Sequence, residues 1–172
     1  MCGLEFDILP ADIDEDSFLG RAPEKLVRDL SFEKAAVIAK QYPDATVIGA
    51  DTIVVLDGKV LGKPKDKADA IDMLTRLQGR AHLVVGGFTI LNNGERLTES
   101  CETKVTFMKL TPTEIKAYVE TGEPMDKAGA YGAQGIGASF VDKIEGSYTN
   151  VVGLPLRECV AALKRLGIVT VK

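Results

Sequence analysis

The chain has 172 residues, with 25 acidic side chains, 21 basic side chains and a formal charge of −4. This length fits a single domain over residues 1–172, and a hydrophobic fraction of 45% excludes a disordered or collagen-like chain. The acidic balance and the scattered lysines argue against a nucleic-acid-binding face, since such faces concentrate positive charge. No apolar run approaches the roughly 18 residues that span a bilayer, so we expect a cytoplasmic protein with no membrane contact.

The predicted elements alternate between strands, marked by alternating or β-branched apolar residues, and helices, marked by apolar residues three and four positions apart. In the first half these are, in chain order, a strand at residues 4–9, an acidic loop at 12–16, a helix at 23–41, a strand at 46–56, a turn at Asp57-Gly58, a short strand at 60–61 and a helix at 67–78. In the second half they are strands at 82–91 and 97–108 around Asn93-Gly94, a helix from the capping box at Thr111 to Gly122, a glycine-rich stretch at 127–139, a strand at 140–144, a helix at 155–166 and a strand at 168–171.

The fold class follows from this alternation. Residues 46–56 are apolar at almost every position, which is typical of a strand buried on both faces. Helices and strands that alternate around such a strand predict an α/β fold with helices on both faces of the sheet. The hairpin turns add antiparallel pairs, so we expect a mixed, twisted sheet flanked by helices.

Asp51 interrupts the middle of this apolar strand. An ionised carboxylate among apolar residues costs several kcal/mol unless a cation or hydrogen bonds meet it. One interpretation is a strand end at which Asp51 caps a neighbouring turn. The other, which we favour, is a carboxylate presented at the mouth of a central strand, where ligands of α/β sheets bind.

Three further charged residues are candidates for a site. Lys34 falls on the apolar stripe of its helix, which places its ammonium group over an apolar face, and extension of the side chain to solvent is the alternative to a functional role. Lys63 lies between a glycine and a proline in a loop that could direct it at an anion. Glu15 belongs to the acidic loop, which is either solvated or supplies a second carboxylate for a divalent cation.

The glycine-rich stretch at 127–139 is the last candidate. Glycines at this density let backbone amides approach a phosphate or a base, although a flexible turn is the alternative. The spacing matches neither a dinucleotide-binding motif nor a P-loop. Gln134 within the stretch carries one amide donor group and one acceptor, which suits it to reading the edge of a base. His82, at a strand start, is interpreted as a packed or surface residue without a catalytic role.

Five motifs together closely resemble the Maf family of nucleoside triphosphate pyrophosphatases. They occur in the order and spacing of that family, from about Leu4 to Leu166. The motifs are Gly49-Ala-Asp-Thr-Ile-Val-Val, Gly62-Lys-Pro, Gly79-Arg-x-His, Met125-Asp-Lys-Ala-Gly-Ala-Tyr-Gly-Ala-Gln-Gly and Asn150-Val-Val-Gly-Leu-Pro-Leu. The resemblance implies hydrolysis of a nucleoside triphosphate to the monophosphate and pyrophosphate, with a divalent cation (Mg²⁺ or Mn²⁺), on a fold like that of inosine triphosphate pyrophosphatase.

The resemblance also implies roles for the charged candidates. Asp51 matches the proposed general base of the family. Glu15, Lys34 and Lys63 match positions that the family uses around the cation and the phosphates. Because a carboxylate can either activate water or hold the cation, Asp51 is predicted both as catalytic base and, with Glu15, as metal ligand.

Base selection is implied at two other positions. Thr52 and Gln134 match the base-specificity positions of the family, and their identities resemble the branch that acts on dTTP and UTP. The expected substrates are therefore dTTP, UTP and modified pyrimidine nucleotides. The alternative is a catalytically impaired, nucleotide-binding regulator of septum formation and cell division.

The beginning of the chain departs from the family pattern. Family members begin with a short apolar strand and a Ser-x-Ser-Pro-Arg-Arg loop, whereas Met1-Cys2-Gly3-Leu4 aligns after that point. Arginines of such a loop would hold phosphate bidentately, which a lysine does not reproduce. The expected consequences are reduced phosphate binding and an unpaired sheet edge that invites homodimerisation or strand swapping.

Overall fold

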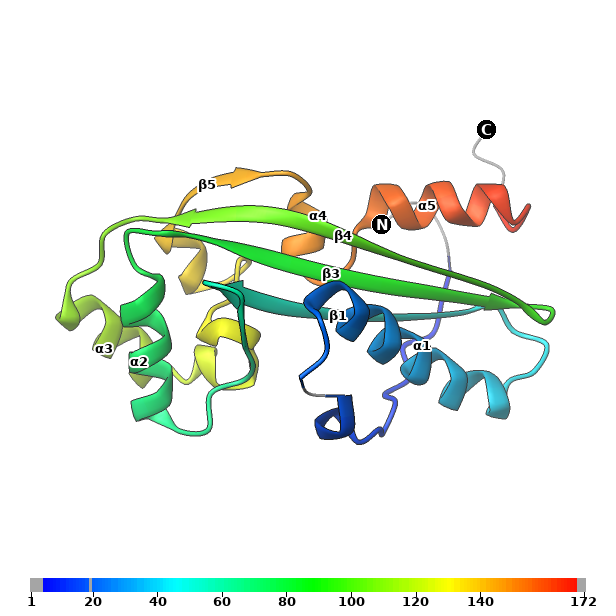
Figure 1. Cartoon of the computed structure of the whole chain (residues 1–172), viewed down its shortest axis with the longest axis horizontal. Helices are drawn as coiled ribbons and strands as arrows, with labels where there is room; N and C mark the ends of the chain where they lie inside the picture. Colours follow the sequence, from blue (N-terminus) through cyan, green and yellow to red (C-terminus); the bar gives the residue numbers. More distant parts are fainter. Residues whose placement is uncertain (1–4, 19, 170–172) are drawn as a thin grey trace.

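The computed structural model describes residues 5–18 and 20–169 and consists of one five-stranded antiparallel sheet with helices on both faces (Figure 1). The strands, in the sheet order β2-β1-β3-β4-β5, are β1 (Val47–Leu56), β2 (Lys59–Leu61), β3 (Ala81–Asn92), β4 (Glu95–Phe107) and β5 (Val141–Glu145). The α-helices are α1 (Pro23–Gln41), α2 (Lys67–Leu77), α3 (Pro112–Glu120), α4 (Tyr148–Val151) and α5 (Leu156–Arg165). Four 3₁₀ turns are η1 (Glu15–Phe18), η2 (Glu123–Asp126), η3 (Ala128–Ala130) and η4 (Ile136–Phe140).

Local sequence explains where most elements begin and end. The Asn93-Gly94 hairpin has φ of 47° and 80°, as a two-residue turn with a positive φ at both positions requires. Thr111 and Glu114 form the predicted capping box of α3, with the Glu114 amide donating to the Thr111 hydroxyl at 3.3 Å and the Thr111 amide donating to Glu114 Oε2 at 2.7 Å. The predicted helices and hairpins are therefore confirmed.

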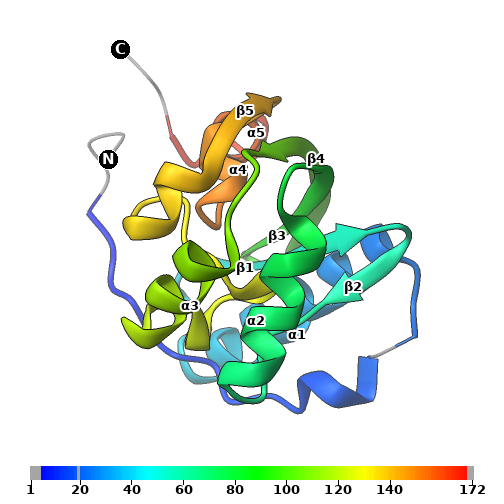
Figure 2. The ribbon, with the colours of Figure 1, turned by 90° about the vertical axis from the view of Figure 1, so that its left-hand side faces the viewer.

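The two faces of the sheet carry different layers. On one face, Ile53, Val55 and Val85 pack against Leu26 and Leu30 of α1. On the other face, a larger cluster joins β1, β3 and β4 to α2 and α3, which lie side by side in both views (Figures 1 and 2). Helix α5 lies near the opposite end of the sheet, where Cys159, Ala162 and Leu163 form a third cluster with Phe88 and Ile90. The prediction of a sheet covered on both faces is confirmed.

The prediction of a mixed sheet is wrong, because all four described strand pairings are antiparallel. The Asp57-Gly58 turn reverses the chain after β1. Helix α2 then returns the chain to the other side of β1, so that β3 also runs opposite to β1. The connection between β1 and β3 therefore contains a hairpin as well as a helix. A connection through a helix alone would have made β1 and β3 parallel.

Two predicted terminal strands do not form in the described residues. Residues 5–9 have no strand conformation, and Phe6 and Ile8 are 71% and 84% exposed. Alternation of apolar and polar residues marks a segment that could join a sheet. A strand forms only when such a segment can hydrogen-bond to the edge of another strand, and no described strand runs beside residues 5–9. Residues 168–169 are also outside any strand, and Leu4 and residues 170–171 lie outside the described residues.

One side of β1 is largely open. Strand β2 pairs only with residues 54–56 of β1, so the outer side of residues 47–53 has no partner among the described strands. Asp51 and Thr52 lie in this open part of the strand. Among the described helices, none is both long enough and apolar enough to cross a membrane.

His82 is a buried, neutral residue of the core. Its Nε2 lies 2.8 Å from the Tyr131 hydroxyl, and its ring packs edge-on against Phe107 and Tyr131. Burial lowers the pKa of His82 from 6.5 to about 4. The interpretation as a packed histidine without a catalytic role agrees with this environment.

This pKa predicts a pH dependence of stability. Below pH 6.5 the unfolded chain takes up a proton at His82 that the folded chain takes up only near pH 4, so stability is complete above pH 6.5 and falls as the pH decreases toward 4. We expect His82 to account for about 3 kcal/mol of the loss in unfolding free energy over this window. Urea unfolding at a series of pH values measures the fall in unfolding free energy between pH 6.5 and pH 4. That fall should be about 3 kcal/mol smaller in His82→Asn than in the wild type. An identical pH slope in both proteins would contradict the prediction.

Candidate active site

A lysine and two carboxylates from three different elements meet on the α1 face of the sheet. Lys34 Nζ lies 2.7 Å from Asp51 Oδ1 of β1 and 2.7 Å from Glu15 Oε1 of η1. The side chains of Asp51, Lys34 and Glu15 are 10%, 22% and 47% exposed, so the cluster extends from the sheet toward solvent. The structure therefore brings together three of the predicted site residues, and Lys34 points at a buried anion instead of extending to solvent.

Two glycines allow α1 to approach the sheet closely enough for this contact. A Cβ on Gly49 would collide with the backbone carbonyl oxygen of Ser31, one turn before Lys34. A Cβ on Gly87, which pairs with Asp51 across β1 and β3, would lie 2.6 Å from the Val27 carbonyl oxygen. Glycine within a strand is typical of such close backbone approach.

The electrostatics of the cluster follow from burial and pairing. Burial raises the pKa of Asp51, and the hydrogen bond and charge of Lys34 oppose this effect without cancelling it. For Lys34, burial alone would favour the neutral amine, but the bonds to Asp51 and Glu15 outweigh it and raise the pKa of Lys34. Lys34 is therefore a fixed positive charge beside Asp51, and Asp51 is a more basic carboxylate than an exposed aspartate.

Lys63 lies near this cluster without an ion pair to it among the described residues. It is exposed, in the loop between β2 and α2, and its charge makes a small contribution to the pKa of Asp51, which burial raises, and to that of Asp126, which the hydrogen bond from Lys127 lowers. The loop is fixed beside it, because the Gly129 amide donates to the Gly62 carbonyl oxygen at 3.0 Å. Lys63 is thus free to meet an anion that approaches Asp51.

The donor set suits a cation shared with phosphate better than a cage made only of protein. In the part of the chain that the structure describes, no three His, Cys, Asp or Glu side chains are grouped to hold a metal. Glu15 and Asp51 offer two carboxylates that lie near each other, because both pair with the Lys34 ammonium. Mg²⁺ typically takes one or two carboxylates and completes its shell with substrate phosphates and water, so these two residues fit that mode of binding.

A cavity of about 230 Å³ lies on the opposite face of the sheet. The predicted residues Thr52 and Gln134 both line it, together with Lys127, Tyr131 and Val84, and with Val54, Ala128, Gly132, Ala133, Gly135, Val151, Val152 and Gly153. Successive residues of a strand point to opposite faces. Asp51 therefore faces α1, whereas Thr52 faces the cavity and donates from Oγ1 to the Gly153 carbonyl oxygen at 3.3 Å.

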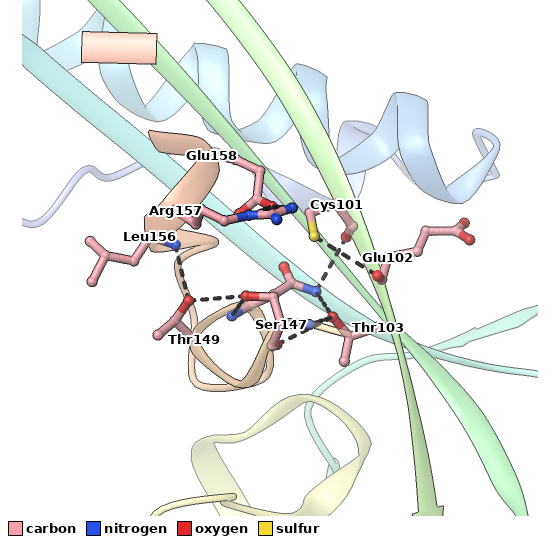
Figure 3. A network of polar contacts seen from close by, with 9 residues as sticks. Cys101, Glu102, Thr103, Ser147, Thr149, Leu156, Arg157 and Glu158 are labelled. Carbon is pink, nitrogen blue, oxygen red and sulfur yellow. Dashed lines mark hydrogen bonds and ion pairs between the residues drawn. The ribbon is translucent and has the colours of Figure 1, made fainter. Parts of the chain in front are cut away.

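Asn150 of α4 supports the wall of this cavity. Its Nδ2 donates to the carbonyl oxygens of Val84 at 3.1 Å and Cys101 at 3.2 Å, and so joins α4 to β3 and β4. Figure 3 shows the surrounding network, in which Thr103 and Ser147 are bonded to each other and the Leu156 amide donates to Thr149. Asn150 holds the residues that follow it, 151–153, against the cavity.

The glycine-rich stretch owes its glycines to packing. Side chains already occupy the space that a Cβ would need: Lys127 at Gly132, the Glu123 carboxylate at Gly135 and the Tyr118 hydroxyl at Gly137. At Gly129, a Cβ would lie 2.8 Å from the Val54 side chain. These contacts indicate a packed loop and not a flexible turn, and the approach of its backbone amides to a phosphate or a base stays a prediction.

Several residues of the site were not among the sequence-based candidates. Lys127 and Tyr131 line the cavity, and Asn150 supports it. The adjacent pair Gly86-Gly87 in the middle of β3 is the signal that was available, because glycines within a strand mark close approach from neighbouring elements. Gly87 admits α1 on one face, and Gly86 admits the side-chain amide of Asn150 on the other.

Comparisons with known proteins show the family to which this chain belongs. A family model described as Maf-like protein matches residues 1–166. A dTTP/UTP pyrophosphatase of Desulfotalea psychrophila is 48% identical over 171 residues, which are 98% of this chain and 88% of that protein. Proteins of the same name from Geobacillus sp. (50% over 168 residues; 97% of this chain, 90% of that protein) and Syntrophus aciditrophicus (46% over 172 residues; 99% and 84%) are also similar. The chain belongs to the Maf family.

Proposed function

We propose that this chain hydrolyses dTTP, UTP and modified pyrimidine nucleotides to the nucleoside monophosphate and pyrophosphate. The observation that carries the proposal is the pair of consecutive residues on β1. Asp51 is a largely buried carboxylate, with its side chain 10% exposed, that is held by Lys34, and Thr52 lines a cavity on the other face together with Gln134. The similar proteins named dTTP/UTP pyrophosphatase support the same activity.

The geometry supports separate binding places for the base and for the triphosphate of the substrate. The base occupies the cavity, where the Gln134 amide and the Thr52 hydroxyl can bond to its edge. The triphosphate crosses the open side of β1 at residues 51 and 52 and so reaches the cluster on the other face. This path uses the part of β1 that has no partner strand among the described residues.

The chemical step needs a base and positive charge at the leaving group. Asp51 accepts a proton from a water molecule as the water oxygen bonds to the α-phosphorus, and its raised pKa makes it a better acceptor than an exposed aspartate. The bond from the α-phosphorus to the bridging oxygen breaks, and that oxygen leaves with pyrophosphate. Lys34 and Lys63 neutralise the charge that develops on the leaving group.

A divalent cation, Mg²⁺ or Mn²⁺, is part of the proposal. Glu15 and Asp51 are the residues that would hold it, and the cation would supply further charge neutralisation to the phosphates. Cytoplasmic location and a homodimer remain predictions from the sequence. No observation favours a separate role as a regulator of septum formation.

Pyrophosphate release from a panel of nucleotides tests the proposal. We expect release from dTTP and UTP in the presence of Mg²⁺ or Mn²⁺, and loss of that release when EDTA is added in excess. The panel should include CTP, GTP and 7-methyl-GTP. Release from 7-methyl-GTP without release from dTTP or UTP would contradict the substrate assignment. Thermal stabilisation by nucleotides without any turnover would show binding alone.

A further inference from the structure

The loop that carries Gln134 is fastened on both sides of that residue to one carboxylate and one hydroxyl. The Ile136 amide donates to Glu123 Oε2 at 2.8 Å, and the Gly137 amide donates to Glu123 Oε1 at 3.0 Å. On the other side of Gln134, the Gly132 amide donates to the Tyr118 hydroxyl at 3.2 Å. The Tyr118 hydroxyl in turn donates to Glu123 Oε1 at 2.9 Å, so the two attachments form one network.

This network is specific to the loop and is not a general surface contact. Tyr118 is 2% exposed, and its ring packs edge-on against Phe140 at a centroid distance of 4.8 Å, which fixes the position of its hydroxyl. A Cβ at Gly135 would lie within 2.6 Å of the Glu123 carboxylate, and a Cβ at Gly137 would lie 2.6 Å from the Tyr118 hydroxyl and 2.9 Å from the Gly132 carbonyl oxygen, so a side chain at either position would displace the network. Charged acceptors of backbone amides make hydrogen bonds that are stronger than neutral ones.

Gln134 itself depends on this backbone for its position. Its side chain is exposed at the cavity and makes no hydrogen bond to the described residues. An amide that reads a base must present its donor and its acceptor at fixed places, and small displacements of such groups weaken recognition strongly. Besides the bonds to Glu123 and Tyr118, the loop is held by a long bond of 3.5 Å from the Tyr148 hydroxyl to the Ala133 carbonyl oxygen and by bonds within its own turn at residues 135–139. Glu123 is the only described residue whose side chain bonds the backbone amides that follow Gln134, at Ile136 and Gly137.

We propose that Glu123, together with Tyr118, is a positioning residue that sets base selectivity by fixing the backbone on both sides of Gln134. The inference rests on the proposed function. Glu123 does not line the cavity and belongs to η2, so its effect on the nucleotide is transmitted through the loop. A loosened loop would present the Gln134 amide at varying places, so thymine and cytosine, which differ in the donor and acceptor at position 4, would be distinguished less well.

Kinetics of Glu123→Gln with dTTP and dCTP test the proposal. The variant keeps the size of the side chain but replaces one acceptor oxygen by a donor, so one loop amide loses its partner. We expect the ratio of kcat/KM for dTTP to kcat/KM for dCTP to fall about tenfold, corresponding to one lost hydrogen bond of about 1.4 kcal/mol. Tyr118→Phe should change the ratio in the same direction. Glu120→Gln is the matched control, because Glu120 pairs with Lys67 on the surface, and its ratio should equal that of the wild type.

A double variant separates positioning from a general loss of structure. If Glu123 acts through Gln134, then Glu123→Gln in a Gln134→Ala background should cause no further loss of selectivity. A merely structural role would lower kcat/KM for both nucleotides equally and would leave the ratio unchanged. An unchanged ratio in an active, folded Glu123→Gln protein overturns the proposal, as does a full additional loss in the double variant.

Hydrogen exchange gives a readout that does not depend on turnover. The amides of Ile136 and Gly137 should be protected in the wild type and should exchange at least tenfold faster in Glu123→Ala, with unchanged protection in β3. Unchanged protection at both amides would contradict the anchoring. If the wild-type chain releases no pyrophosphate from either nucleotide, the proposed function and the selectivity role both fail. In that outcome, the exchange rates still decide whether Glu123 holds the loop.

Discussion

Asp51→Asn is expected to reduce pyrophosphate release from dTTP and UTP at least about a hundredfold, because a general base typically contributes at least that factor. The asparagine side chain has nearly the same shape and can still accept a hydrogen bond from Lys34, but it cannot accept the proton of the attacking water. Loss of the carboxylate also removes one of the two proposed cation ligands. The effect should therefore appear mainly in kcat and should persist at high nucleotide concentration.

The fold should survive this substitution. Asparagine keeps the shape of Asp51 and can accept the hydrogen bond from Lys34, and Glu15 still pairs with the Lys34 ammonium at 2.7 Å, so the lysine is not left without a partner. Steady-state kinetics and a thermal melt on the same preparation give both readouts. Asp57→Asn is the matched control, because Asp57 lies in the exposed turn directly after β1 and asparagine suits its φ of 51°. Full activity of Asp51→Asn would remove Asp51 from its proposed role.

Gly49→Ala is expected to destabilise the protein by about 3 kcal/mol or more, at the upper end of overpacking substitutions. The added methyl group would collide with the carbonyl oxygen of Ser31 and would lie 2.8 Å from the Ala35 amide nitrogen, and neither backbone atom can move without shifting α1. A shifted α1 would also carry Lys34 away from Asp51, so activity should fall in the fraction that remains folded.

Urea unfolding measures the first effect, and turnover of the folded protein measures the second. Gly62→Ala is the control for stability, because a Cβ at Gly62 meets no atom within 4 Å. An unchanged unfolding free energy for Gly49→Ala would contradict the close packing of α1 against β1. Unchanged turnover with a large loss of stability would show that the Lys34 contact tolerates the shift.

The strongest sequence-based predictions concern residues that violate a local pattern. Asp51 breaks an apolar strand, and Lys34 breaks the apolar stripe of a helix, and the structure pairs these two with each other at 2.7 Å. A charge on an apolar face costs free energy unless a group of opposite charge lies beside it. Two residues of opposite charge that break apolar patterns in neighbouring elements therefore indicate an ion pair. The proposed role of Thr52 came from the family resemblance alone, because a threonine in a strand violates no pattern. Gln134 was a candidate because its amide carries both a donor and an acceptor, and the resemblance added the assignment to base selection.

Features that depend on long-range packing could not be predicted in the same way. The contact between Glu123 and the loop at 136–137 joins residues through a turn without regular periodicity, so no spacing rule reports it. The antiparallel sense of β1 and β3 depends on the path of the chain through β2 and α2, whereas local patterns report only the type of each element. Residues 5–9 alternate like a strand but remain unpaired, because pairing is a property of two segments.

In the proposed function, the placement of Asp51 and Thr52 on opposite faces of β1 makes substrate choice separable from reaction chemistry. Residue 52 and the loop around Gln134 can change without altering the cluster of Asp51, Lys34 and Glu15, so new base preferences can be obtained while the hydrolytic step is retained. The same arrangement limits insertions, because one extra residue in β1 before Asp51 would turn the carboxylate toward the cavity and the hydroxyl toward α1. Engineering of this scaffold for other nucleotides should therefore leave the length of β1 unchanged and vary the side chains on its cavity face.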